Sequence, residues 1–193
     1  MGLTRAELDA FRGATLPDLV GPKVRLLFVG VNPGLRTVAV QAHFAPRGNR
    51  FYPALFRAGI VDRLVDASAG FVPVDRAHLV ARGVGITSLV AAATARADEL
   101  SVAELVAGAR SLTERVRRIG PAVVAVLGIT AYRIAFERPK AVVGRQPEGL
   151  GGAQLWVVPN PSGLNAHATV ASLANAYREV AIAAGIEVDD VAR

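Results

Sequence analysis

Apolar residues along the chain gather in four short, nearly unbroken runs, each about as long as a β-strand. Such runs are typical of strands covered on both faces, whereas a half-exposed strand alternates apolar and polar positions. The runs span 24–31, 85–90, 122–127 and 155–158. Turn residues end the first run at Asn32-Pro33-Gly34 and the last at Pro159. The pattern therefore predicts four buried strands.

Segments between these runs carry helix-start signals and helical spacing of apolar residues. Ser101 and Glu104 form a capping box, the following apolar positions recur with helical spacing, and Gly120-Pro121 ends the segment. Thr4 and Glu7 form a second capping box, which opens a short helix. Further helices are predicted over 49–59, 75–82 and 169–184. This alternation predicts an α/β fold of three layers, in which helices cover both faces of a central, mainly parallel sheet.

Composition narrows the class of protein. A chain of 193 residues that is 52% hydrophobic and 20% charged is not disordered, and its length fits one domain over 1–193. No run reaches the roughly 18 apolar residues of a membrane span, so we expect a cytoplasmic, monomeric protein with no membrane contact. The chain has no cysteine, and its three histidines are widely separated in sequence. We therefore expect no disulfide, metal or other cofactor.

The charge balance is basic. The formal net charge is +6, and all basic residues except Lys23 and Lys140 are arginine. A positive protein suits a polyanionic partner such as nucleic acid, because cations that meet phosphates release condensed counterions. Arginine richness also follows from a GC-rich genome, so the charge alone does not decide the partner.

Two loops at the predicted carboxyl edge of the sheet are the candidates for chemistry, because ligands of open α/β sheets bind there. The loop over 32–50 follows the first strand, and the loop over 159–167 follows the last. Each contains an Asn-Pro pair, and either pair alone is typical of an ordinary turn. The chain has no phosphate-binding glycine motif after a strand, and Ser162 is not in a nucleophile elbow. Covalent catalysis and phosphate-loop chemistry are not indicated.

An ordered set of segments resembles the mismatch-specific uracil/thymine DNA glycosylases, the second family of the uracil-DNA glycosylase superfamily. Gly30-Val31-Asn32-Pro33-Gly34 is similar to the first motif of that family, and Asn160-Pro161-Ser162-Gly163-Leu164 is similar to its second. Between them, Asn49-Arg50-Phe51-Tyr52 resembles its Asn-Arg-Phe-aromatic element, and 85–90 resembles its middle strand. The resemblance extends over about 26–184, and the ordered set is far more specific than one motif.

The resemblance implies a monofunctional DNA glycosylase in base excision repair. Such an enzyme flips uracil, or a damaged pyrimidine such as ethenocytosine, out of double-stranded DNA and hydrolyses its N-glycosidic bond opposite guanine. It assigns catalysis to Asn32, which would hold the attacking water, and to Asn160, for which a loop-capping role is the alternative. It assigns base binding to Ser88, to the backbone amide of Val31, and to the ring and backbone amide of Phe44.

The second motif implies contacts with the DNA itself. Leu164 resembles the apolar wedge that fills the gap left by the flipped base, and Gly163 and Asn165 would read the widowed guanine. A core leucine that packs against the last helix is the alternative for Leu164. The chain departs from the family after this wedge, where Asn165-Ala166-His167 stands in place of a Ser-Arg pair. The phosphate grip of that arginine is lost unless His167 or nearby arginines replace it.

Two other classes of function remain open. One is a nucleic-acid-binding domain of the same fold with weak or no catalysis, and the other is an α/β nucleoside-binding enzyme. Retention of Asn32 and Phe44 favours the glycosylase over the first, and the missing phosphate loop disfavours the second. Ala91 stands where the family often has an acidic residue, and Ser88 stands at a position that varies within the family, where we expect it to tune the choice of base.

Overall fold

A five-stranded sheet forms the centre of the computed structural model, which describes residues 3–166 and 168–189. The strand order is β2-β1-β3-β5-β4. Strands β1 (Leu26–Gly30), β2 (Val84–Ser88), β3 (Val123–Leu127) and β5 (Gln154–Val158) are parallel, and the edge strand β4 (Gly144–Arg145) runs antiparallel to β5. The mainly parallel sheet confirms the predicted α/β fold.

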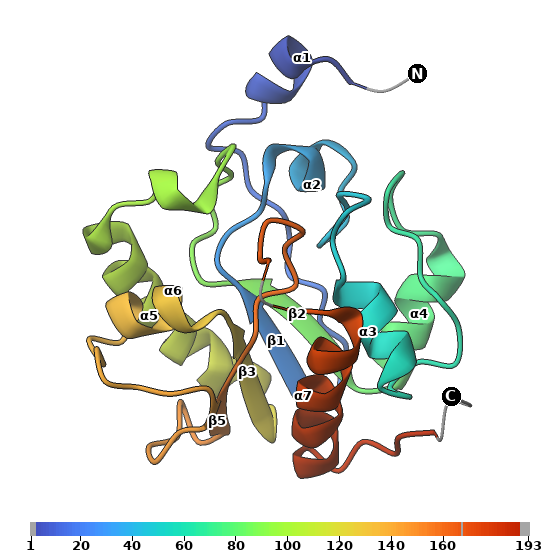
Figure 1. Ribbon diagram of the computed structural model, residues 1–193, viewed down its shortest axis with the longest axis vertical. Helices are drawn as coiled ribbons and strands as arrows, with labels where there is room; N and C mark the ends of the chain where they lie inside the picture. Colours follow the sequence, from blue (N-terminus) through green and yellow to red (C-terminus); the bar gives the residue numbers. More distant parts are fainter. Residues whose placement is uncertain (1–2, 167, 190–193) are drawn as a thin grey trace.

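Helices cover both faces of this sheet and complete three layers (Figure 1). Helices α3 (Phe51–Arg57), α4 (Pro73–Ala81) and α7 (Val170–Ala183) pack on one face, and α5 (Val102–Ile119) and α6 (Ile129–Ala135) pack on the other. Among the described residues, no helix is long and apolar enough to cross a membrane. The remaining helical segments among the described residues are α1 (Arg5–Asp9), α2 (Leu35–Ala39) and the 3₁₀ turn η1 (Ala97–Glu99).

Side chains of successive residues in a strand point to opposite faces of the sheet, so they pack into different hydrophobic cores. In β1, Leu26 and Phe28 pack into the core under α3, α4 and α7, whereas Leu27 and Val29 pack into the core under α5 and α6. All four side chains are fully buried. Because both faces of the strand are covered, polar residues are excluded at every position, which explains the unbroken apolar run in the sequence.

Four short elements are absent from the prediction, and one of them is the 3₁₀ turn η1. The predicted loop over 32–50 is wrong in that it contains α2, and no element was predicted where α6 and β4 lie. Helix α2 has no side-chain cap, and α6 begins directly after Gly128, whose φ of 119° lies outside the range that suits other residues. A helix of five or seven residues without a capping side chain leaves no recognisable start signal.

Candidate active site

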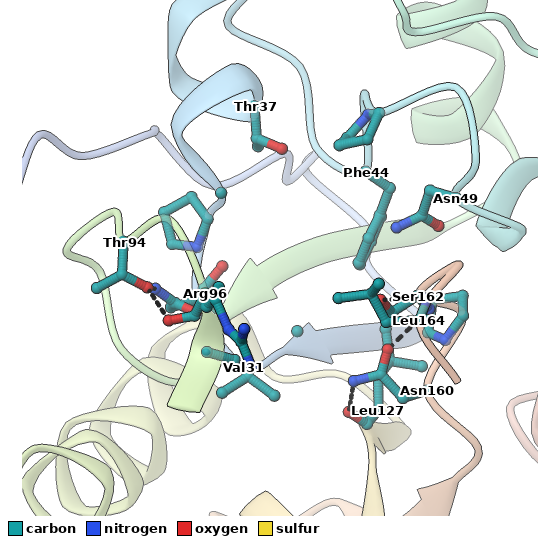
Figure 2. A pocket seen from close by; sticks show the side chains of 18 of the residues that line it. Val31, Thr37, Phe44, Asn49, Thr94, Arg96, Leu127, Asn160, Ser162 and Leu164 are labelled. Atoms are coloured by element: carbon teal, nitrogen blue, oxygen red, sulfur yellow. Dashed lines mark hydrogen bonds between the residues drawn. The ribbon is translucent and has the colours of Figure 1, made fainter. Parts of the chain in front are cut away.

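A cavity of about 380 Å³ opens at the carboxyl edge of the sheet (Figure 2). Val31, Thr94 and Arg96 lie on one side of it, and Phe44 and Leu164 lie on the other. Its size is in the range of small-molecule sites. The predicted site residues that line it are Val31, Asn32, Phe44, Ser88, Asn160 and Leu164. The two remaining predicted residues, Gly163 and Asn165, belong to the loop beside it rather than to its lining.

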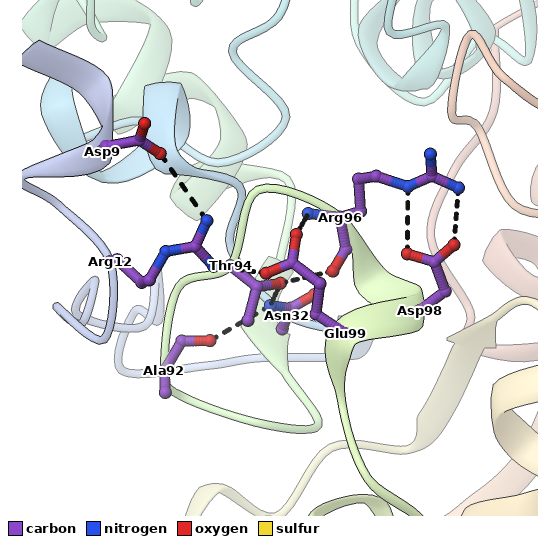
Figure 3. Close-up of polar contacts among 8 residues, drawn as sticks. All are labelled: Asp9, Arg12, Asn32, Ala92, Thr94, Arg96, Asp98 and Glu99. Carbon is purple, nitrogen blue, oxygen red and sulfur yellow. Dashed lines mark hydrogen bonds and ion pairs between the residues drawn. The ribbon is translucent and has the colours of Figure 1, made fainter. Parts of the chain in front are cut away.

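Asn32, two residues after the end of β1, has its amide held in one orientation. Its Nδ2 donates to the carbonyl oxygen of Ala92 over 3.1 Å and to Oγ1 of Thr94 over 2.7 Å (Figure 3). A backbone carbonyl only accepts hydrogen bonds, so the amide nitrogen must face the loop that contains Ala92 and Thr94. Oδ1 is the other end of the amide, and it has no hydrogen-bond partner among the described residues. It can accept a hydrogen bond from a water, although an amide is too weak a base to remove its proton.

The loop that holds Asn32 is itself fixed by polar contacts (Figure 3). Thr94 Oγ1 donates to the carbonyl oxygen of Arg96 over 2.7 Å. The Arg96 guanidinium donates to both carboxylate oxygens of Asp98, which lowers the pKa of Asp98, and Arg12 pairs with Glu99. These exposed ion pairs contribute little to stability. Sequence reasoning did not find Thr94, because a threonine among alanines carries no motif.

Phe44 forms a wall of the cavity. Its φ of 55° lies in the left-handed region, which is uncommon for residues other than glycine. Its ring stacks on Phe51 with 4.0 Å between ring centroids, and a Cβ on Gly30 would lie 3.5 Å from the ring. Phe44 is half-buried and lines the cavity, so its side chain is accessible from the cavity. Among the described residues, no group accepts a hydrogen bond from the Phe44 backbone N–H.

His43 anchors the backbone that presents Phe44. Its Nε2 lies 3.1 Å from the carbonyl oxygen of Pro17, and the carbonyl oxygen of His43 accepts from Tyr52 Oη over 2.9 Å. Because a carbonyl only accepts, Nε2 carries the proton of the neutral ring. Burial lowers the pKa of His43, although the bond to Pro17 and the charge of Asp18 act in the opposite direction.

This lowered pKa predicts a loss of stability in mild acid. The unfolded chain, with a histidine pKa near 6.5, binds more protons than the folded chain below that pH. The stabilisation is therefore complete above about pH 6.5 and is lost as the pH falls towards the folded pKa. We expect the melting temperature of the wild type to fall between pH 7 and pH 5, and that of His43→Gln to fall less over the same interval. An equal fall in both proteins, measured by thermal melts, would contradict this role for His43.

The end of β2 is fixed by a polar network from α5. Arg115 Nη2 donates to the carbonyl oxygen of Ser88 over 2.7 Å, and its Nη1 donates to Oγ1 of Thr87 over 3.0 Å. Thr87 in turn donates to the carboxylate of Asp18 over 2.5 Å. Ser88 is buried and lines the cavity. The position of Ser88 is thus fixed by the side chain of Arg115, which comes from α5.

Asn160 lines the cavity, but both ends of its amide form hydrogen bonds with backbone groups. Its Oδ1 accepts from the N–H of Ser162 over 2.8 Å, and its Nδ2 reaches the carbonyl oxygen of Leu127 over 3.4 Å. This is the geometry of the loop-capping alternative. A direct catalytic role for Asn160 stays a prediction.

Leu164 projects from the loop over 160–166, which we call the wedge loop. Its side chain is 88% exposed, so the alternative of a packed core leucine is wrong. Asn165 Nδ2 donates to the carbonyl oxygen of Asn160 over 3.0 Å, and this bond closes the loop. His167, which was considered as a replacement for the phosphate-gripping arginine of the family, lies outside the described residues. An apolar side chain displayed in this way is available to another molecule.

A comparison with known protein families finds a match over most of the chain. The model of the family described as the uracil DNA glycosylase superfamily matches residues 17–182. The chain belongs to the uracil DNA glycosylase superfamily. The matched range contains every residue assigned above to the cavity and the wedge loop. Membership at this level makes the protein a DNA glycosylase, a class of DNA-repair hydrolase that acts on DNA.

A solved structure has the same fold. It is the solution NMR structure of a candidate uracil DNA glycosylase from Methanosarcina acetivorans. The TM-score is 0.55 at 14% sequence identity, and the match covers 88% of this chain and 98% of the other. At that identity the likeness supports the fold and leaves the choice of base to the residues of the site.

Proposed function

We propose that this glycosylase excises uracil, and related damaged pyrimidines, from mismatches with guanine. The observation that carries the proposal is the orientation of Asn32, whose Oδ1 is free to hold a water in a cavity walled by the ring of Phe44. The two Asn-Pro motifs, similar to those of the mismatch-specific glycosylases, support the choice of substrate. We further propose that the protein acts as a cytoplasmic monomer on chromosomal DNA.

Hydrolysis in this site proceeds without a covalent enzyme intermediate. The flipped base stacks on Phe44, an interaction worth roughly 1–3 kcal/mol. The bond between C1′ and the base nitrogen breaks with its electron pair staying on the base. The water held by Asn32 forms the new bond to C1′ and releases a proton to the solvent. The sugar passes through an oxocarbenium-like state, and the base leaves as an anion. Backbone N–H groups of Phe44 and Val31 stabilise that anion, and preorganised donors of this kind are a large source of rate.

The wedge loop acts on the DNA rather than on the bond. Leu164 enters the gap that the uracil leaves, which offsets part of the lost base stacking. Backbone groups of Gly163 and Asn165 face the widowed guanine and give the preference for that partner. The net positive charge of the chain supports binding to the phosphate backbone.

The reaction should leave an intact abasic strand. Schiff-base chemistry requires an amine in the site, but Lys23 precedes β1, at the opposite edge of the sheet, and Lys140 lines a separate cavity beside β4. We therefore expect no protein–DNA adduct when borohydride is added during turnover. A trapped adduct on a denaturing gel would replace the hydrolytic mechanism with a lyase mechanism.

A direct assay tests the function. Purified protein is incubated in EDTA with labelled duplexes that carry uracil opposite guanine, uracil opposite adenine, or thymine opposite guanine, followed by alkali to break abasic sites. The expected result is cleavage that is fastest for uracil opposite guanine. EDTA is included because we expect the reaction to need no metal ion. Asp98 is the one carboxylate among the described residues lining the cavity, and it is paired with Arg96. Binding without cleavage of any duplex would favour the nucleic-acid-binding alternative.

A further inference from the structure

Arg50, in the turn before α3, is joined to the wedge loop by its backbone and by its side chain. Its backbone N–H donates to the carbonyl oxygen of Pro161 over 3.0 Å. Its Nη2 donates to the carbonyl oxygens of Ser162 and Asn165, the latter over 2.8 Å, and its Nη1 donates to that of Ala168. These acceptors lie on both sides of Leu164 in the sequence. One planar guanidinium therefore spans the whole loop that displays the wedge.

The charge of Arg50 is committed to this loop. Among the described residues no carboxylate pairs with Arg50, and its Nε is buried without a hydrogen-bond partner. A half-buried cation is costly unless hydrogen bonds replace its hydration, and here backbone carbonyls supply them. Outward movement of the loop would leave the guanidinium without these acceptors. The loop is consequently held in one shape before DNA arrives.

Close packing on the neighbouring segment supports the same conclusion. A Cβ placed on Gly163 would lie 2.8 Å from the carbonyl oxygen of Gly48, a distance that real Cβ atoms essentially never show. The residue before Leu164 thus sits directly on the backbone of the segment that leads to Arg50. At the root of the loop, Tyr177 Oη donates to the carbonyl oxygen of Pro159 over 3.4 Å. The tip that carries Leu164 remains exposed while its supports are fixed.

We propose that Arg50 is a positioning residue for base extrusion, which holds the wedge loop in the shape that presents Leu164 to the duplex. This inference rests on the proposed function. Arg50 acts through the loop and contacts neither the base nor the attacking water, so its effect falls on substrates that must be unstacked. Lysine cannot replace it, because one ammonium cannot reach carbonyls that are spread along the loop in the way a planar guanidinium does.

The test compares Arg50→Lys with wild type on a uracil–guanine duplex and on single-stranded DNA that contains uracil, under single-turnover conditions. We expect cleavage of the duplex to slow by roughly 10- to 100-fold, as for other small misplacements of a working group, and cleavage of the single strand to change by less than about threefold. Equal slowing on both substrates, or no slowing on either, would overturn the proposal. Wild type that cleaves neither substrate would instead refute the proposed function.

A matched control and a second variant separate positioning from general instability. Arg82→Lys alters another half-buried arginine, which donates to the carbonyl oxygens of Ile60 and Glu187 near the opposite edge of the sheet, and it should cleave both substrates at wild-type rates. If Arg50→Lys melts far below wild type, Gly163→Ala tests the same idea, because it moves the loop off Gly48 without altering Arg50. It should show the same duplex-specific loss, and its absence would also overturn the proposal.

A double-mutant cycle gives a third reading. If Arg50 acts by presenting the wedge, Arg50→Lys should cost little once the wedge side chain is gone in Leu164→Ala. The expected duplex rate of the double variant is thus within about threefold of that of Leu164→Ala alone. Fully multiplicative losses would show that Arg50 acts independently of Leu164 and would overturn the proposal.

Discussion

Asn32→Ala should slow cleavage of a uracil–guanine duplex by about 100-fold or more while leaving its affinity for that duplex nearly unchanged. The reason is positional: the substitution removes Oδ1, the atom placed to hold the water, and loss of a well-oriented reacting group typically costs at least this much. The side chain lines the cavity that the proposed function gives to the flipped base, so its removal should leave contacts with the rest of the duplex in place. Single-turnover rates and duplex binding, measured on the same preparation, give the two quantities.

A second variant separates catalysis from folding at this position. Thr94→Val removes the acceptor that lies 2.7 Å from Asn32 Nδ2 but keeps the amide itself, so it should slow cleavage by about tenfold, less than Asn32→Ala. Parallel loss of cleavage and binding in Asn32→Ala would mean that the amide serves mainly to hold the loop over 92–96. In that case, Thr94→Val should also bind the duplex more weakly.

Much of this architecture can be predicted from the sequence because its physical causes are local or periodic. Strands buried on both faces require unbroken apolar runs, and β1 and β3 are found within two residues of where those runs lie. Capping boxes at Thr4 and Ser101 identify helix starts because side chain and backbone bond within four residues. The meeting of two loops at one edge follows from parallel strands alone.

The missing parts depend on contacts between residues distant in the sequence. Thr94 orients Asn32 across an interval of 62 residues, and Arg50 reaches Asn165 across 115. Neither pairing has a fixed spacing that a motif could encode. The capping role of Asn160 is different, because its bond to Ser162 spans two residues and the turn could therefore be predicted. The local spacing does not determine whether the same side chain also acts in catalysis.

The exposure of Leu164 sharpens the interpretation of its sequence motif. A leucine packed beneath α7 would cost about 2–5 kcal/mol of stability when cut to alanine, whatever the substrate. A side chain that is 88% exposed has little packing to lose, so Leu164→Ala should change the free energy of unfolding by about 0.5 kcal/mol or less. Thermal melts therefore serve as an internal control for the experiment on activity.

Leu164→Ala should slow excision most where the uracil is hardest to extrude. Unstacking a base costs a few kcal/mol, and the wedge offsets part of that cost by filling the gap. We expect about a 10- to 100-fold loss on uracil in a stable duplex and less than about threefold on uracil in a frayed end or a single strand. Leu164→Met, which keeps an apolar side chain of similar volume, should retain most of the duplex activity. A large drop in melting temperature together with equal losses on all substrates would remove Leu164 from the site.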